Sequence, residues 1–276
     1  MAVELSGSVG RIGEKMRGVR AIHPAVRGAS PLAALALLLA LIMTPAARGQ
    51  GCAAGWLPGV GITGTNDIVN ALAVLPNGDV IVGGVFTLAG GRAASGIARY
   101  NPASGVWSPL GSGVNGGVSA LAVLPDGDVL VGGNFTNAGG VAARSVARYS
   151  PNTGAWSATG GVGGSVRAFA ILPSGDVIVG GSFTIVNGVD TGTVGPGVIA
   201  ANNIARFNPT ARSWSALSTG LDGSVSALAL LPSGNVLVGG SFTTAGGWGA
   251  NRLARVNPTT GVWSVPLDTG TSGTVE

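Results

Sequence analysis

Acidic residues are the strongest candidates for catalysis in this chain of 276 residues. The only histidine, His23, and the only lysine, Lys15, precede residue 50, in a segment that we expect to be removed on export. Without them the remaining chain cannot build a Ser-His-Asp triad, a histidine zinc site or a Schiff base. A glycosidase needs only two carboxylates at a set separation. Asp190 and Asp222 could supply them, which leaves a hydrolase or lyase as an alternative function.

Other charged residues recur at a regular spacing. The recurring acids are Asp79, Asp128 and Asp176, with Asn235 in the fourth place, and the recurring arginines are Arg99, Arg148, Arg206 and Arg255. The acids could be metal ligands, and the arginines could form an anion-binding ring. Each acid, however, follows a glycine in a turn, where Asp bonds its own backbone and Asn is tolerated. We therefore expect each arginine to pair with the acidic turn of its own or a neighbouring repeat, and we expect no metal site and no cofactor.

These residues belong to a segment that occurs four times. Its copies begin near Val69, Val118, Val166 and Val225. Each copy has an ALAVLP-like run, a Gly-Asp or Gly-Asn turn, V-[IL]-V-G-G-x-F-T, then A-R-x-[NS]-P and a closing Trp-Ser. The recurring prolines Pro76, Pro125, Pro173 and Pro232 give periods of 49, 48 and 59 residues. A period near 50 with several short apolar runs is typical of a β-propeller blade.

Each repeat contains four short predicted strands. In the first copy they cover 69–75, 80–82, 96–100 and 106–108. The first strand is apolar on both faces, as expected where sheets stack face to face around an axis. A Gly pair inside the second strand indicates a β-bulge or a close approach of backbones. We expect the recurring tryptophans to pack in the core or between blades; they are Trp107, Trp156, Trp214 and Trp263.

The sequence therefore predicts an all-β chain, a β-propeller of about four four-stranded blades that is incomplete or open, preceded by a signal peptide helix. The predicted divisions are a leader (1–49), a segment with a blade-closing strand (50–68), repeats at 69–117, 118–165 and 166–224, and a fourth repeat with the start of a further one (225–276). The third repeat carries a loop insertion. We expect the chain to be the first part of a longer propeller or a truncated copy of one. A closed four-bladed ring is the alternative, but it would leave a spare strand and an exposed edge, through which the chain could associate with itself.

The leader has the organisation of a secretory signal peptide. Residues 1–31 are basic, residues 32–43 are an unbroken apolar run, and Pro45–Gly49 supply a small-x-small cleavage site. The apolar run is too short to cross a bilayer as a helix. We expect cleavage after Gly49, with the start at Met1 or Met16 left open and an uncleaved anchor as the alternative. The mature protein would be secreted, extracellular or held in the cell envelope, without an integral membrane span.

Charge is concentrated in the leader. Six of the 15 basic residues and two of the 11 acidic residues precede residue 50, which leaves nine of each in the remainder. A neutral body without basic clusters offers no electrostatic footprint for nucleic acid. Nucleic acid is therefore not an expected partner.

The loop after each Phe-Thr differs most between repeats. The third repeat has its insertion there, and only the fourth has a tryptophan there. In a propeller these loops share one face with the connections between blades, and loops on a rigid scaffold commonly carry function. The candidate ligand-binding residues are Trp248, Asp190, Asn251, Arg92 and Arg144. The alternative is a plain insertion with Trp248 covering it.

The repeats resemble the kelch-like, galactose-oxidase-type propeller class. They are most similar to secreted bacterial repeats built on LAVLPxGDVxVGGxFTxAGGxxxxxIARYNPxTGxWS, and also to the extracellular propeller of fungal cortical polarity markers. The resemblance covers about residues 54–270 and implies a binding or surface scaffold. The copper-oxidase branch of the class needs Tyr, His and Cys, whereas His23 and Cys52 lie outside the repeats. That branch is excluded.

Three functions remain open from the sequence. The first is a secreted, non-enzymatic propeller that binds protein or glycan through the loops of one face. The second is a propeller glycosidase or lyase that uses Asp190 and Asp222. The third is a structural envelope protein whose repeats assemble through an unpaired terminal blade.

Overall fold

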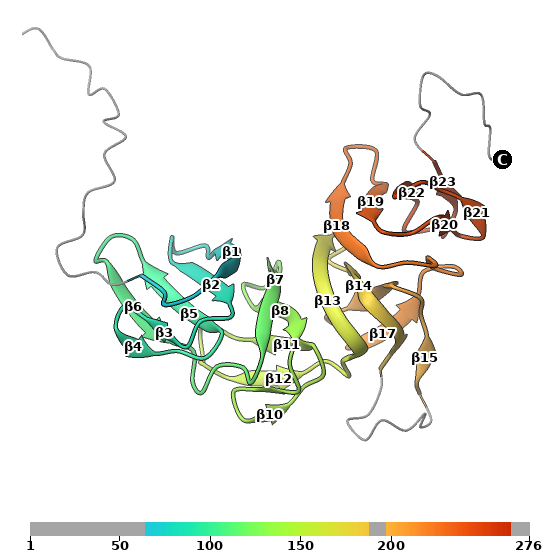
Figure 1. The fold of residues 1–276 in the computed structure, drawn as a ribbon. Helices are drawn as coiled ribbons and strands as arrows, with labels where there is room; N and C mark the ends of the chain where they lie inside the picture. Colours follow the sequence, from blue (N-terminus) through green and yellow to red (C-terminus); the bar gives the residue numbers. More distant parts are fainter. Residues whose placement is uncertain (1–63, 188–196, 266–276) are drawn as a thin grey trace, which may run out of the picture. The chain divides into compact units, whose positions relative to one another are not determined.

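The computed structural model describes residues 64–187 and 197–265, and every regular element in these ranges is a β-strand (Figure 1). The predicted signal peptide, the blade-closing strand before residue 64 and the start of a fifth repeat lie outside the described residues, as does Asp190. Within the described ranges, no helix is long and apolar enough to cross a membrane. The prediction of an all-β chain is confirmed.

Four antiparallel sheets follow one another along the chain, and we call them blades 1 to 4. Blade 1 contains β1 (Val69–Val74), β2 (Val80–Gly84), β5 (Ile97–Asn101) and β6 (Val106–Pro109). Blade 2 contains β7 (Gly117–Val123), β8 (Val129–Asn134), β11 (Val146–Tyr149) and β12 (Trp156–Ala158). Blade 3 contains β13 (Val162–Ile171), β14 (Val177–Val186), β16 (Ile204–Asn208) and β17 (Ser213–Ala216). Blade 4 contains β18 (Val225–Leu230), β19 (Val236–Gly240), β22 (Leu253–Val256) and β23 (Trp263–Ser264). These strands pair in chain order in every blade, so the predicted four-stranded blades are confirmed.

Short hairpins occupy the connection between the second and third main strands of three blades. They are β3 (Leu88–Ala89) with β4 (Arg92–Ala93), β9 (Asn137–Ala138) with β10 (Val141–Ala142), and β20 (Thr244–Ala245) with β21 (Trp248–Gly249). In blade 3, β14 is longer and pairs with β15 (Ile199–Ala200). The chain entering a blade forms a bridge to that blade's hairpin, as Leu221 does with Ala245. The sequence predicted plain loops here, because strands of two residues have no periodicity to detect.

The first glycine of each Gly-Gly pair lets the next blade approach closely. The contacts pair Gly83 with Val118, Gly132 with Val166 and Gly180 with Val225, where an added Cβ would lie 2.5 Å, 2.6 Å and 2.5 Å from the valine Cγ1. Such distances are well inside van der Waals contact, so a side chain at these glycines would force the blades apart. The predicted close approach is confirmed as a contact between blades.

The second glycine of each pair lies opposite a β-bulge within its own blade. The register between the first two strands shifts at the same place in all four blades, for example between Val118 and Ala120 in β7. A Cβ at Gly133 would lie 2.0 Å from the carbonyl oxygen of Gly117 in that bulged strand. The glycine pair therefore serves both purposes that the sequence suggested.

The recurring tryptophans pack on the aromatic or apolar residue of the third strand. The ring centroids of Trp107 and Tyr100, Trp156 and Tyr149, and Trp214 and Phe207 are 4.8 Å, 5.0 Å and 4.8 Å apart. Trp214 and Trp263 are buried in clusters shared by consecutive blades. The Nε1 of Trp156 donates to the carbonyl of Leu110, in the connection that enters its blade. Their predicted packing role is confirmed.

Burial of the first strand depends on the blade. Val118 in β7 is fully buried, whereas Leu72 and Val74 in β1 are 64% and 66% exposed. Ala227 and Ala229 in β18 are also exposed. The expectation that this strand is buried on both faces is therefore wrong for β1 and β18. The reason is that no described residues form a blade before blade 1 or after blade 4.

Substitution of Gly180 tests the contact between blades. Gly180→Ala should lower the free energy of unfolding by about 1–3 kcal/mol, because the methyl group overlaps Val225 and the packed blades cannot move apart freely. Chemical denaturation measures the change. Gly249→Ala is the matched control, since that strand glycine has no heavy atom within 4 Å of the added Cβ. Equal effects of the two substitutions would contradict the packing argument.

Candidate functional site

A polar cleft lies between blades 3 and 4, at the ends of the blades where the hairpins and the connections between blades meet. Its volume is about 440 Å³. The lining residues are Thr184, Asn202 and Asn203 of blade 3, Thr219, Gly220, Leu221 and Asp222 of the connection, and Thr244 and Gly247 of the blade 4 hairpin. The cleft is therefore made from the two kinds of loop that the sequence placed on one functional face.

Hydrogen bonds between its walls hold the cleft in shape. Asn202 donates from Nδ2 to the carbonyl of Thr219 at 3.1 Å, and Asn203 donates to the carbonyl of Leu221 at 2.9 Å. The amide of Leu221 donates back to the carbonyl of Asn202 at 3.1 Å. Asn203 has a φ of 65°, a left-handed conformation that asparagine adopts more readily than most residues. The blade 3 wall and the connection are thus fixed before any ligand arrives.

Asp222 fixes the connection to the blade 4 hairpin. Its Oδ1 accepts hydrogen bonds from the amides of Thr243 and Thr244, both at 2.8 Å, and its Oδ2 accepts one from the Thr243 hydroxyl at 2.5 Å. The hydroxyl of Thr243 and these amides lower the pKa of Asp222 to about 2. Asp222 is therefore a carboxylate at neutral pH and is a poor proton donor.

The position of Asp222 recurs in other blades. Asn115 accepts hydrogen bonds from the amides of Thr136 and Asn137 with the same geometry, and Asn66 does so in blade 1. A side-chain oxygen is therefore needed at this place to hold the hairpin. The sequence analysis considered Asp222 only as a catalytic candidate, because Asn and Asp at aligned positions carry no visible common pattern until the hairpin is known.

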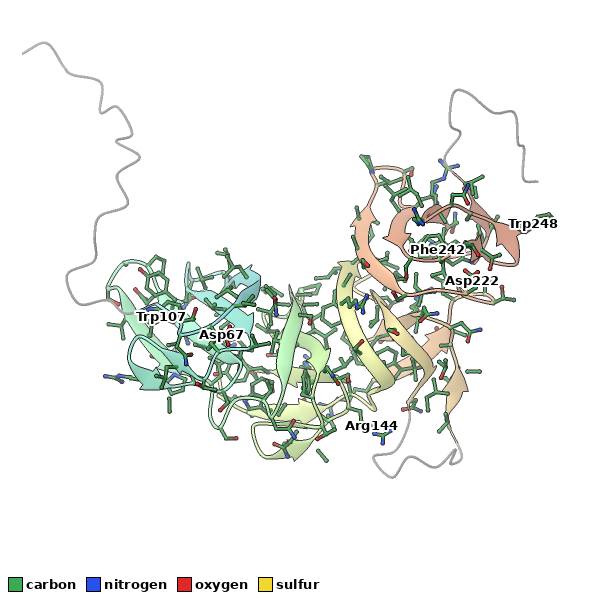
Figure 2. The ribbon with its side chains drawn as sticks, in the orientation of Figure 1. Asp67, Trp107, Arg144, Asp222, Phe242 and Trp248 are labelled. Carbon is green, nitrogen blue, oxygen red and sulfur yellow. The ribbon has the colours of Figure 1, made fainter. Side chains whose placement is uncertain are left out.

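Trp248 lies on the opposite face of the blade 4 hairpin from the cleft. In the hairpin Thr244 pairs with Gly249 and Ala245 pairs with Trp248, and successive residues of a strand point to opposite faces. Thr244 lines the cleft, whereas Trp248 lines a small crevice with Trp263. Figure 2 shows Trp248 projecting outward from the blade while Phe242 lies inside it. Trp248 is 53% exposed, so it is an accessible aromatic surface outside the cleft.

The other predicted ligand-binding residues do not converge on the cleft. Arg92 is exposed in β4 of blade 1, at the place that Trp248 occupies in blade 4, since each pairs with the hairpin alanine. Arg144 is in blade 2, and Asn251 is exposed just before β22. None of the three is among the described residues that line the cleft. Asp190 lies outside the described residues, so its pairing with Asp222 stays a prediction.

The recurring arginines are engaged in structural pairs. Arg99 donates to Asp79 and Arg148 donates from Nε to Asp128 at 2.6 Å. Arg206 pairs with Asp176 in the same way. In blade 4, where Asn235 replaces the acid, Arg255 donates to the Ser264 hydroxyl instead. The expected pairing of arginines with the acidic turns of their own repeats is confirmed in three blades.

These pairs also link consecutive blades. Arg148 donates from Nη1 to the carbonyl of Pro209 in blade 3, and Arg206 donates to that of Pro258 in blade 4.

Bonding to Arg99 lowers the pKa of Asp79, so this carboxylate stays charged down to low pH. Among the described residues no group of three or more His, Cys, Asp or Glu could hold a metal ion.

Comparison with known proteins supports the same architecture. The profile of the Rax2 C-terminal β-propeller domain matches residues 118–193, and that of a β-propeller domain of unknown function, DUF5122, matches residues 75–106 and 231–261. The chain is a β-propeller repeat protein. These matches do not single out the kelch-like, galactose-oxidase type, which stays a prediction.

Solved structures are similar to the chain at low identity. The extracellular domain of the putative one-component system BT4673 from B. thetaiotaomicron has 13% identity and a TM-score of 0.41, with 64% of this chain and 21% of that chain covered. The WD40 β-propeller domain of Doa1 has 15% identity and a TM-score of 0.42, with 64% and 49% covered. U3-55K has 12% identity and a TM-score of 0.48, with 74% and 53% covered. This chain thus spans between about a fifth and about half of those chains, and no curated protein matches it.

The ionised state of Asp222 gives a pH-dependent prediction. The pKa of Asp222 is lowered on folding, from an unfolded value of about 3.9, so its charge stabilises the fold above that value. This contribution is lost as the pH falls through about 2. Asp222→Asn keeps the bonds to the two amides, as Asn115 does, and removes the charge. Its Nδ2 would donate to the Thr243 hydroxyl, as the Nδ2 of Asn115 donates to that of Thr136, in place of the bond that Oδ2 accepts.

Thermal unfolding of the wild type and Asp222→Asn should therefore differ near neutral pH, and the two melting temperatures should converge as the pH approaches 2. Asp222→Ala, which also loses the acceptor for both amides, should be less stable than Asp222→Asn at every pH. Asp67→Asn controls for the loss of one negative charge. A difference between the melting temperatures of the wild type and Asp222→Asn that widens on acidification would contradict the lowered pKa of Asp222.

Proposed function

We propose that the chain is an exported, non-enzymatic β-propeller scaffold that binds a protein or glycan ligand through the cleft between blades 3 and 4. The observation that supports this most directly is the preformed cleft, whose walls combine Asn202, Thr219 and Asp222. A cleft of this size, about 440 Å³, is in the range of small-ligand sites.

The chemistry of the cleft favours a neutral ligand that is rich in hydroxyl or amide groups. Asp222 is the only ionised side chain among the described lining residues, and none of them is cationic. The hydroxyls of Thr184 and Thr219 make no hydrogen bond to other described residues, so they can bond a ligand. Both sugars and polar protein loops present such groups, whereas phosphate and nucleic acid would be repelled by the carboxylate.

A binding role fits the state of Asp222 better than a catalytic one. A glycosidase requires one carboxyl group that is protonated at the working pH and a second that is ionised. The pKa of Asp222, about 2, excludes it from the protonated role. The ionised role needs an available oxygen, whereas both oxygens of Asp222 already accept hydrogen bonds from the hairpin. Asp222 is therefore better suited to holding the hairpin that forms one wall of the cleft than to catalysis. Export is part of the proposal and is supported by the basic and apolar organisation of residues 1–49.

The proposal predicts that blocking the cleft abolishes binding. A panel of neutral glycans, charged glycans and extracellular proteins would be screened against the immobilised chain, and hits measured by calorimetry. Thr184→Arg should weaken a genuine ligand at least about tenfold, because the larger cation occupies an exposed place on the cleft wall. The type of hit distinguishes glycan from protein.

Thr259→Arg is the matched control. Thr259 is exposed in the turn at the other end of blade 4, so the same charge and bulk are added away from the cleft. Trp248→Ala tests the aromatic surface on the outer face of the hairpin separately. Equal affinities of the wild type and Thr184→Arg would overturn the cleft as the site, and turnover of a glycan by the wild type would overturn the non-enzymatic role.

A further inference from the structure

The first and the last of the four described blades expose the two halves of the contact that joins consecutive blades. In each inner contact, a valine and a larger apolar residue from the first strand of one blade cover the first glycine of the preceding blade's pair. Val118 and Leu121 cover Gly83, Val166 and Phe169 cover Gly132, and Val225 and Leu228 cover Gly180. The same contact thus occurs three times within one chain.

Blade 1 displays the covering half, which we call the leading face: Val69, Leu72 and Val74. These side chains are 40%, 64% and 66% exposed. The equivalent Val118, Val166 and Val225 in the following blades are fully buried. The apolar side chains of β1 therefore have the size and position to cover a glycine, and nothing described lies beneath them.

Blade 4 displays the covered half, which we call the trailing face: Ala227, Ala229, Leu237, Gly239 and Leu253. The register places these residues together, because Gly239 pairs with Ala227 on one side and with Leu253 on the other. A Cβ at Gly239 would have no heavy atom within 4 Å, in contrast to Gly83, Gly132 and Gly180. Leu253 is 43% exposed, whereas its equivalents Ile97, Val146 and Ile204 are fully buried.

We propose that the trailing face of one chain binds the leading face of a second copy. Val69 and Leu72 of the second copy would cover Gly239, as Val118 and Leu121 cover Gly83 within one chain. The occupant is a second copy because a single chain carries both complementary halves, with the same residue types in the same register as its three internal contacts. This contact buries apolar faces, and it differs from the pairing of strand edges that the sequence suggested.

The polar link between blades can form in the same contact. Arg148 and Arg206 donate to the carbonyls of Pro209 and Pro258, in the turn after the third strand of the next blade. Arg255 is the equivalent arginine of blade 4, and Pro102 is the equivalent proline of blade 1. The contact is heterologous, so it joins each chain to the next through different faces and produces a closed ring or a growing assembly.

The test uses the mass of the full chain in solution, measured by light scattering across the micromolar range. The wild type should exceed the mass of one chain and grow with concentration or reach a closed ring. Leu72→Asp places a charge on the leading face, and Gly239→Val fills the space on the trailing face without a clash inside its own chain. Each variant alone should have the mass of one chain.

An equimolar mixture of the two variants provides the decisive measurement. Leu72→Asp retains an intact trailing face and Gly239→Val retains an intact leading face, so the mixture should form a species of two chains and grow no further. Val106→Asp and Gly249→Val are the controls, since both residues lie in strands outside the two faces, and these variants should assemble as the wild type does.

Circular dichroism on each variant checks that the blades remain folded. A wild type that stays at the mass of one chain overturns the proposal. Assembly of either single variant, Leu72→Asp or Gly239→Val, beyond the mass of one chain would also overturn it. So would a mixture of the two variants that stays at the mass of one chain. None of these results depends on the ligand of the cleft, so failure here and failure of the proposed function are distinguishable.

Discussion

The contact between a glycine in the second strand of one blade and a valine in the first strand of the next is the constraint on which this fold depends. At Gly83, Gly132 and Gly180 there is no room for a methyl group. This close approach lets the apolar first strands pack face to face and produces clusters of buried residues shared by consecutive blades. The glycines at these three positions are therefore a packing requirement.

The polar residues that recur with the repeats serve the same purpose. The arginine of each of the first three blades neutralises the aspartate of its own turn, and in blades 2 and 3 it also bonds a carbonyl of the next blade. These three arginines are therefore engaged in ion pairs within their own blades. The cleft between blades 3 and 4, where we propose that a ligand binds, lies at the other end of the blades.

The cleft illustrates how a repeated structural position can differ in charge from one blade to another. Asn66 and Asn115 hold their hairpins with a neutral amide, whereas Asp222 does so with a carboxylate. The longer β14 and its partner β15 change the neighbouring wall in blade 3. The carboxylate that holds the blade 4 hairpin therefore also gives the cleft its negative charge. The neutral asparagines at the same position in blades 1 and 2 add no charge there.

The sequence by itself determined the repeat, the four strands of each blade and the turn pairs of the arginines, because each depends on residue types at a fixed local spacing. It also marked the glycine pair as a β-bulge or a close approach, and only the structure showed that the two glycines divide these roles. Only the tertiary structure decided which loop residues meet. It placed Trp248 on the opposite face of its hairpin from the cleft, brought Asn202 beside Asp222, and left Gly239 uncovered. These outcomes depend on contacts between blades and on two-residue strands, and neither leaves a periodic signal in the chain.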